Sequence, residues 1–145
     1  RDGAGGGAGV VRGGRDRRVL HPDDARRAVD AGVDGIIVSN HGGRQIDGAI
    51  SSVDALAAIA PVVDGRIKVL ADSGIYSGAD VFKVLALGAD AVCIGRPHMY
   101  GLALAGADGA RDAVANIIAE LDLTFGLAGH TNVDELTPEA LATLV

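Results

Sequence analysis

Three short apolar segments that alternate with helical sequence constrain the fold of this chain more than any other feature. The segments are residues 36–38, 66–71 and 91–94, and β-branched and aliphatic side chains predominate in them. The first of them, residues 36–38, is a short β-branched run of the kind found in a strand that is buried on both faces. Because amphipathic helical sequence lies between them, the strands are expected to be joined by right-handed crossovers and to run parallel. The sequence therefore predicts an α/β fold.

The ends of the helices can also be placed from the sequence. A helix is expected from Pro22, with acidic residues in its first turn, to a stop at Gly32. Serine and aspartate three residues apart, the spacing of a capping box, open two further helices at Ser51 and Ser77. After Met99 the chain is predicted to be helical, with a last short helix near residues 137–139.

Composition and charge exclude several classes of function. The chain has 145 residues, a net charge of −6 and 3% aromatic residues, which argues against a nucleic-acid partner. No apolar run approaches the roughly 20 residues of a membrane-spanning helix, and no His/Cys cluster has metal-ligand spacing. The single cysteine, Cys93, suits a reducing compartment. We therefore predict a cytoplasmic protein with no nucleic-acid, membrane or metal partner.

The chain divides into a leader and one domain. Residues 1–18 consist mainly of glycine and arginine without a hydrophobic period, which predicts a leader that is disordered or unrelated to the rest. Residues 19–145 carry the regular pattern and form the predicted domain. Three parallel strands would leave two open sheet edges, so we also expect the folded chain to form a homo-oligomer.

Polar, glycine-bearing loops follow all three predicted strands, at the edge where parallel α/β folds carry their chemistry. After the first strand, His41 and Arg44 could be a proton acceptor and a carboxylate ligand for a small organic acid. They could equally be residues that only tie down the loop. After the second strand, residues 72–78 lead into a helix N-terminus, and Gly95 and Arg96 follow the third. Small residues, backbone N–H groups and an arginine at neighbouring strand ends are typical of a phosphate site.

Two long motifs resemble a known family. The segments SNHGGRQIDG (39–48) and DSGIYSGADVFKVLALGADAVCIGRP (72–97) closely resemble the C-terminal half of the FMN-dependent α-hydroxy acid oxidases and dehydrogenases. That family includes glycolate oxidase, lactate oxidase, lactate 2-monooxygenase and mandelate dehydrogenase. The resemblance implies approximately strands six to eight of a (β/α)₈ barrel, followed by a helical tail. It also implies oxidation of a small 2-hydroxy acid, such as L-lactate or glycolate, to the 2-oxo acid.

The resemblance assigns roles to individual residues. It implies that His41 is the base and that Arg44 binds the substrate carboxylate. The residues that it implies for FMN binding are Ser39, Asp72, Ser73, Gly74, Ile75, Tyr76, Gly95 and Arg96.

The chain departs from the family pattern in two ways. Tyr76 stands where the family usually has an arginine, so one cation near the FMN phosphate is lost. The chain is also shorter than the roughly 250 residues of a complete barrel. One alternative is therefore an inactive half-barrel that binds flavin or phosphate weakly or not at all. Another is a different FMN- or phosphate-binding barrel, such as a relative of inosine monophosphate dehydrogenase.

Several other residues that carry reactive groups receive structural interpretations. Cys93 is predicted to be an inert buried thiol in the middle of the third strand. His98 is interpreted as the start of a surface helix, with a place on the phosphate side of the site as the alternative. His21 is interpreted as a helix-start residue and Asp47 as a turn residue, while His130 is given no role.

Overall fold

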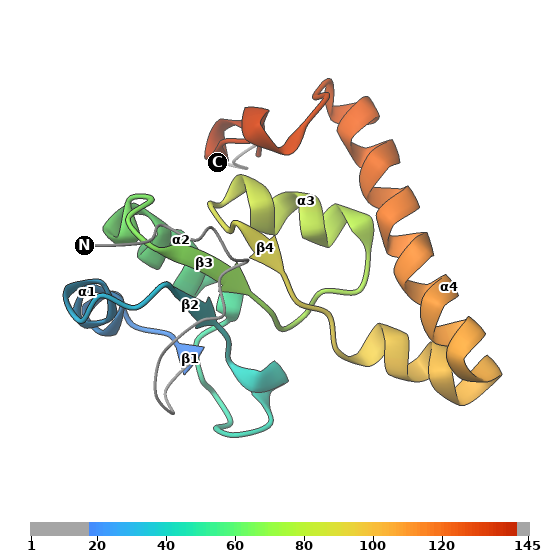
Figure 1. The fold of residues 1–145 in the computed structure, drawn as a ribbon, viewed down its shortest axis with the longest axis horizontal. Coiled ribbons are helices and arrows are strands. Elements are labelled where there is room, and N and C mark those ends of the chain that lie inside the picture. The colour runs from blue at the N-terminus through green and yellow to red at the C-terminus, as the bar shows by residue number, and fades with distance from the viewer. Residues whose placement is uncertain (1–17, 142–145) are drawn as a thin grey trace, which may run out of the picture.

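The computed structural model describes residues 18–141, and its α/β architecture agrees with the prediction. Four parallel strands form one sheet in the order β1-β2-β3-β4 (Figure 1). The strands are β1 (Arg18–Val19), β2 (Gly35–Val38), β3 (Lys68–Ala71) and β4 (Ala91–Val92). The predicted leader, residues 1–18, lies outside the described part except for Arg18. That residue pairs with Ile37 as part of β1.

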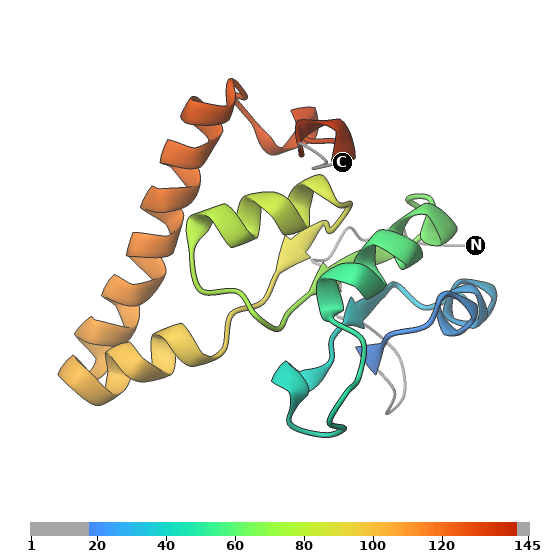
Figure 2. The ribbon, with the colours of Figure 1, turned by 180° about the vertical axis from the view of Figure 1, so that it is seen from behind.

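Helices connect the strands and then extend the chain beyond the sheet. Helices α1 (Pro22–Asp30), α2 (Ser52–Val63) and α3 (Gly78–Ala86) follow the first three strands. Helix α4 (Arg96–Ala128) follows β4, and two single turns of 3-10 helix, at residues 133–135 and 138–140, end the described part. Figures 1 and 2 show α1, α2 and α3 flanking the sheet, with α4 projecting on the side away from β1. No helix in this part of the chain is long and apolar enough to cross a membrane.

The hydrophobic core lies between the sheet and its helices. Ile36 and Val38 of β2 and Val69 of β3 are buried and pack with Leu56 and Ile59 of α2 in one cluster. The strand residues that alternate with these, Ile37 and Leu70, are only half-buried. Burial on both faces was therefore wrong for the residues that the structure describes, because α1, α2 and α3 pack against one face of the sheet only.

Two predicted strands are shorter in the structure, and the last long helix is bent. Strand β3 begins at Lys68 rather than at Arg66, since the Arg66 side chain instead caps α2 by donating to the carbonyl of Val63 at 3.0 Å. Strand β4 ends at Val92, two residues early. Helix α4 starts at Arg96 and bends at Gly106, which has a φ of 62° that glycine tolerates best.

Candidate functional site

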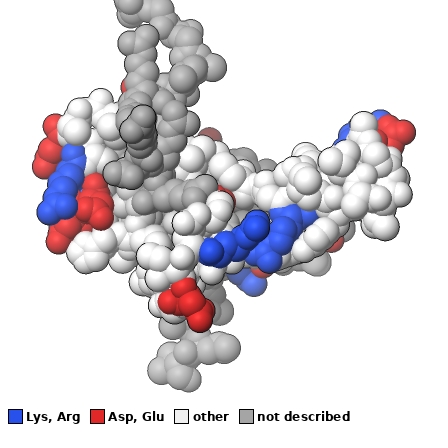
Figure 3. Space-filling view, turned by 90° about the horizontal axis from the view of Figure 1, so that it is seen from below, with Lys and Arg blue, Asp and Glu red and all other residues white. Residues whose placement is uncertain are grey.

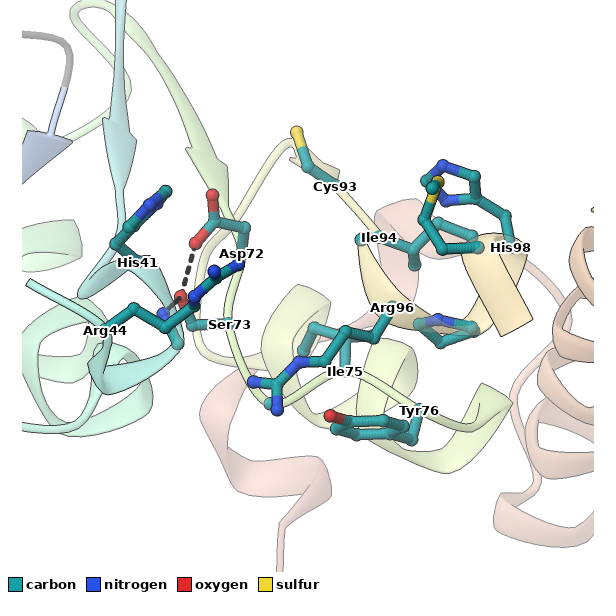
Figure 4. Close-up of a pocket in the computed structure, with 15 residues that line it drawn as sticks. His41, Arg44, Asp72, Ser73, Ile75, Tyr76, Cys93, Ile94, Arg96 and His98 are labelled. Atoms are coloured by element: carbon teal, nitrogen blue, oxygen red, sulfur yellow. Dashed lines mark hydrogen bonds between the residues drawn. The ribbon is translucent and has the colours of Figure 1, made fainter. Parts of the chain in front are cut away.

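An open cleft of about 400 Å³ lies at the carboxyl ends of β2, β3 and β4. Figure 3 shows this face of the molecule, with basic side chains gathered near its middle. Figure 4 shows that the lining side chains come from the three strand-end loops and the first turn of α4. Every predicted site residue except Ser39 lines the cleft, namely His41, Arg44, Asp72, Ser73, Gly74, Ile75, Tyr76, Gly95 and Arg96.

The loop that carries His41 is held in shape by three polar side chains. The Asn40 carboxamide oxygen accepts from the N–H of Gly42 at 2.9 Å and from that of Gly43 at 3.3 Å. The buried hydroxyl of Ser39 accepts from the N–H of His41 at 3.1 Å. Ser73, from the next strand end, also accepts from Gly42 at 3.0 Å. These bonds support a left-handed backbone at His41, with a φ of 57°, and at Gly42, with a φ of 66°.

His41 and Arg44 both line the cleft, although sequence chemistry alone left their roles open. Arg44 extends from the turn after His41 toward the end of β3 (Figure 4). Its guanidinium forms no ion pair with a carboxylate among residues 18–141. A guanidinium without a protein anion beside it can bind an anionic ligand through two parallel hydrogen bonds.

The second loop, residues 72–77, is fixed by bonds to both neighbouring elements. Ser73 has a left-handed φ of 76°, and its hydroxyl contacts the Asp72 carboxylate at 2.5 Å. The Ser73 carbonyl accepts from the buried hydroxyl of Ser52 in α2 at 3.1 Å. Because Ser73 also binds Gly42, one residue connects the loops after β2 and β3.

The N-terminus of α3 is occupied by the protein's own carboxylates. Asp80 accepts from the N–H groups of Tyr76 and Ser77 at 3.1 and 3.0 Å, completing the predicted capping box. Burial raises the pKa of Asp80, but the bonds from Tyr76 and Ser77 outweigh this, so the pKa is lowered overall. Glu120 of α4 accepts from the N–H of Gly78 at 2.9 Å. These donors are therefore not available to a phosphate.

Other backbone donors remain available beside the cleft. Within the described part of the chain, the N–H groups of Gly74, Ile75, Gly95 and Arg96 donate to no protein acceptor. Together they place hydrogen-bond donors on the loops after β3 and β4, both of which line the cleft. The free donors therefore lie on the loops that precede α3 and α4, rather than at the helix N-terminus that the sequence indicated.

The Arg96 side chain lies between two of the loops. Its guanidinium carbon is 5.6 Å from the centroid of the Tyr76 ring. On the other side, a Cβ placed on Gly42 would be only 2.8 Å from the Arg96 Nη2 atom. Arg96 has no carboxylate partner among the described residues. The cleft thus carries two arginines and two histidines against one carboxylate, Asp72, which favours an anionic ligand.

The prediction that Cys93 is a buried thiol within the third strand was wrong. The residue follows β4 rather than lying within it, is partly exposed, and lines the cleft. Burial, followed by the charge of Asp72, raises the pKa of its thiol, so the neutral form predominates at neutral pH. His98 also lines the cleft from the first turn of α4, which agrees with the alternative interpretation of this residue. No group of three His, Cys, Asp or Glu side chains within residues 18–141 could hold a metal ion.

Three residues that support the cleft were not among the predicted site residues. Asn40 lies beside the motif histidine, and its Asx-type spacing to two glycines was the available signal. Ser52 was read only as part of a helix start, and no local signal distinguishes its contact with Ser73. Glu120 is 42 residues from Gly78, so no spacing rule could have paired them.

The fold and the cleft define a parallel α/β protein with a cleft that carries two arginines at its strand ends. A sequence model of the FMN-dependent dehydrogenase family matches residues 17–143, and the chain belongs to this family, whose cofactor is FMN. It is 56% identical to an L-lactate oxidase of Lysinibacillus sphaericus over 118 residues, which cover 81% of this chain and 31% of that protein. It is 49% identical to a peroxisomal (S)-2-hydroxyacid oxidase of Arabidopsis thaliana over 125 residues, covering 86% and 34%.

The chain is also similar to solved structures of FMN-containing oxidases. A mandelate oxidase variant with a monooxide FMN adduct superimposes with a TM-score of 0.78 and 52% identity, covering 80% of this chain and 37% of that chain. The chain spans about a third of the length of the curated relatives that it matches.

Proposed function

We propose that this chain supplies part of the active site for the FMN-dependent oxidation of a small 2-hydroxy acid to the 2-oxo acid. L-Lactate and glycolate are the substrates to test first, and the leading relatives include an L-lactate oxidase. In this proposal β2, β3 and β4 are strands six to eight of a (β/α)₈ barrel. The observation that carries it is that His41 and Arg44 line the same cleft as the two phosphate-type loops.

The residues present suit the phosphate end of FMN. Within residues 18–141, the Arg96 guanidinium has no carboxylate partner, and the free N–H groups of Gly74, Ile75 and Gly95 lie on the two loops beside it. We assign the phosphate to this group and the ribityl chain to the loop at Asp72 and Ser73. Ser39 is buried behind His41 in the described part of the chain, so its assigned contact with flavin remains a prediction.

The chain's own residues perform two tasks in this reaction. Arg44 binds the substrate carboxylate through its fork of N–H donors and so orients the carbon that carries the hydroxyl. His41 accepts one proton from the substrate at an imidazole nitrogen. When bound, FMN accepts the electron pair and the other hydrogen. The loss of one proton and one hydride equivalent converts the hydroxy acid to the oxo acid.

The first test separates flavin binding from turnover. The purified chain is mixed with FMN and desalted, and retained, perturbed flavin bands are expected in its visible spectrum. Anaerobic L-lactate should then bleach these bands. His41→Ala should slow bleaching by about 10²–10⁴-fold, the usual contribution of a positioned base. The control His21→Ala removes an exposed histidine that caps the N-terminus of α1 and does not line the cleft, so the rate should stay unchanged.

A matched pair of arginine variants tests the carboxylate ligand. Arg44→Met should weaken L-lactate binding far more than FMN binding, whereas Arg27→Met, on the exposed face of α1, should change neither. Equal losses of substrate and flavin binding in Arg44→Met would contradict the assigned role. Retained flavin that no 2-hydroxy acid bleaches would favour an inactive flavin-binding chain, and no retained flavin would contradict cofactor binding by this chain alone.

Self-association and location are part of the same proposal. Large apolar side chains of α4 are exposed, with Leu104 at 88% and Leu127 at 90%, and the outer edges of β1 and β4 carry no further strand among residues 18–141. We therefore expect a homo-oligomer, which sedimentation equilibrium would detect. We also propose a cytoplasmic location, to be checked by fractionation, although the plant relative is named as peroxisomal.

A further inference from the structure

The contact between Arg96 and Tyr76 has the geometry of a cation–π interaction. The guanidinium carbon lies 5.6 Å from the ring centroid, inside the roughly 6 Å at which such contacts are attractive. Figure 4 shows the Arg96 guanidinium beside the Tyr76 ring. Arg96 forms no ion pair or side-chain hydrogen bond within residues 18–141. The ring is thus the principal contact that orients this charge.

The backbone of Tyr76 is well placed for such a role. Its N–H donates to Asp80, which also binds Ser77, so the chain at the ring is tied to the first turn of α3. On the opposite side, the guanidinium lies so close to Gly42 that a side chain at this position would collide with it. A long arginine side chain loses substantial rotamer entropy when a ligand fixes it. A ring that already restricts Arg96 reduces that loss before the ligand arrives.

We propose that Tyr76 is a positioning residue that holds Arg96 toward the phosphate of the flavin and so favours FMN over riboflavin. This inference rests on the proposed function, because FMN is taken as the ligand of the cleft. The aromatic face of Tyr76 carries the effect through Arg96, and the phenol hydroxyl is not required.

Equilibrium binding of FMN and riboflavin to the full chain measures this selectivity. Tyr76→Leu removes the ring and should weaken FMN binding about two- to fivefold, the strength of an exposed cation–π contact, without changing riboflavin binding. Tyr76→Phe keeps the ring and should bind both flavins as the parent does. Arg96→Met should weaken FMN binding further, and adding Tyr76→Leu to it should have no additional effect on FMN.

Tyrosine fluorescence gives a second readout that needs no flavin. The chain has no tryptophan and only two tyrosines, Tyr76 and Tyr100. In Tyr100→Phe, an exposed position on α4, all emission comes from Tyr76. Titration with inorganic phosphate at constant ionic strength should change this emission, and Arg96→Met in the same background should abolish the change.

The two readouts distinguish failure of the inference from failure of the proposed function. If neither flavin binds but phosphate still changes the emission through Arg96, the positioning role stands and flavin binding by this chain fails. Unchanged FMN-to-riboflavin selectivity in Tyr76→Leu would overturn the positioning role, as would an equal loss in Tyr76→Phe and Tyr76→Leu. A phosphate response that persists in Arg96→Met would also overturn it.

Discussion

Replacement of Gly78 by alanine should separate α3 from α4, because these helices approach too closely at this residue for any side chain. A Cβ at Gly78 would lie 2.0 Å from the backbone nitrogen of Leu121 and 2.3 Å from the backbone carbon of Glu120. Ordinary contact begins at 3.4 Å, so α4 would have to move by about 1.4 Å. Backbone atoms cannot relieve this contact by changing rotamer.

The expected cost has two parts. Overpacking of a close interface typically destabilises by about 1–3 kcal/mol. The same movement weakens the 2.9 Å bond from the Gly78 N–H to the Glu120 carboxylate. A bond to a charged group contributes about 1.5–3 kcal/mol, so its partial loss adds about 1 kcal/mol. We therefore expect Gly78→Ala to lower the free energy of unfolding by about 2–4 kcal/mol.

The chain offers a matched control in the same helix pair. Gly126 lies within α4, and no atom of the described residues lies within 4 Å of a placed Cβ. Gly126→Ala should therefore raise the free energy of unfolding by about 0.5–1 kcal/mol, the helix-propensity difference between the two residues. Urea denaturation followed by circular dichroism measures both variants. A loss below about 1 kcal/mol in Gly78→Ala, or the same sign of change in both variants, would refute the close packing of α3 on α4.

Three further predictions concern the cleft and its supports. Gly42→Ala should weaken FMN binding in equilibrium titrations, since its Cβ would displace the Arg96 guanidinium and the residue has a left-handed φ; unchanged affinity would contradict this placement. Because the folded pKa of Asp80 is lowered, its contribution to stability is present above its ordinary value of 3.8 and is lost as the pH falls through the folded value. Asp80→Asn should remove this part of the acid dependence in urea titrations at pH 2–5, and an unchanged profile would argue against the cap. The raised pKa of Cys93 should make its alkylation by iodoacetamide at pH 7 slower than that of a free thiol. Rapid alkylation of the folded chain would contradict that shift.

Local sequence patterns were sufficient for the fold class and for most of the candidate site. The apolar runs at residues 36–38 and 66–71 indicated parallel strands, and the loops after them carried His41, Arg44 and the 72–76 segment that now line one cleft. These features depend on neighbours in the chain, such as the Ser77–Asp80 capping box. Strand β1 was missed because its two residues are too few to show a period.

The tertiary structure alone decided which groups in the cleft are free and which are already bound. Glu120 occupies the N–H of Gly78 from 42 residues away, and Ser73 binds Gly42 from 31 residues away. The contact of Arg96 with Tyr76 and the exposure of Cys93 to the cleft also depend on the tertiary structure. The sequence determined the elements and the chemistry of their loops, since both arise from adjacent residues. The crossovers between parallel strands set the contacts between those loops, because they bring distant strand ends to one edge of the sheet.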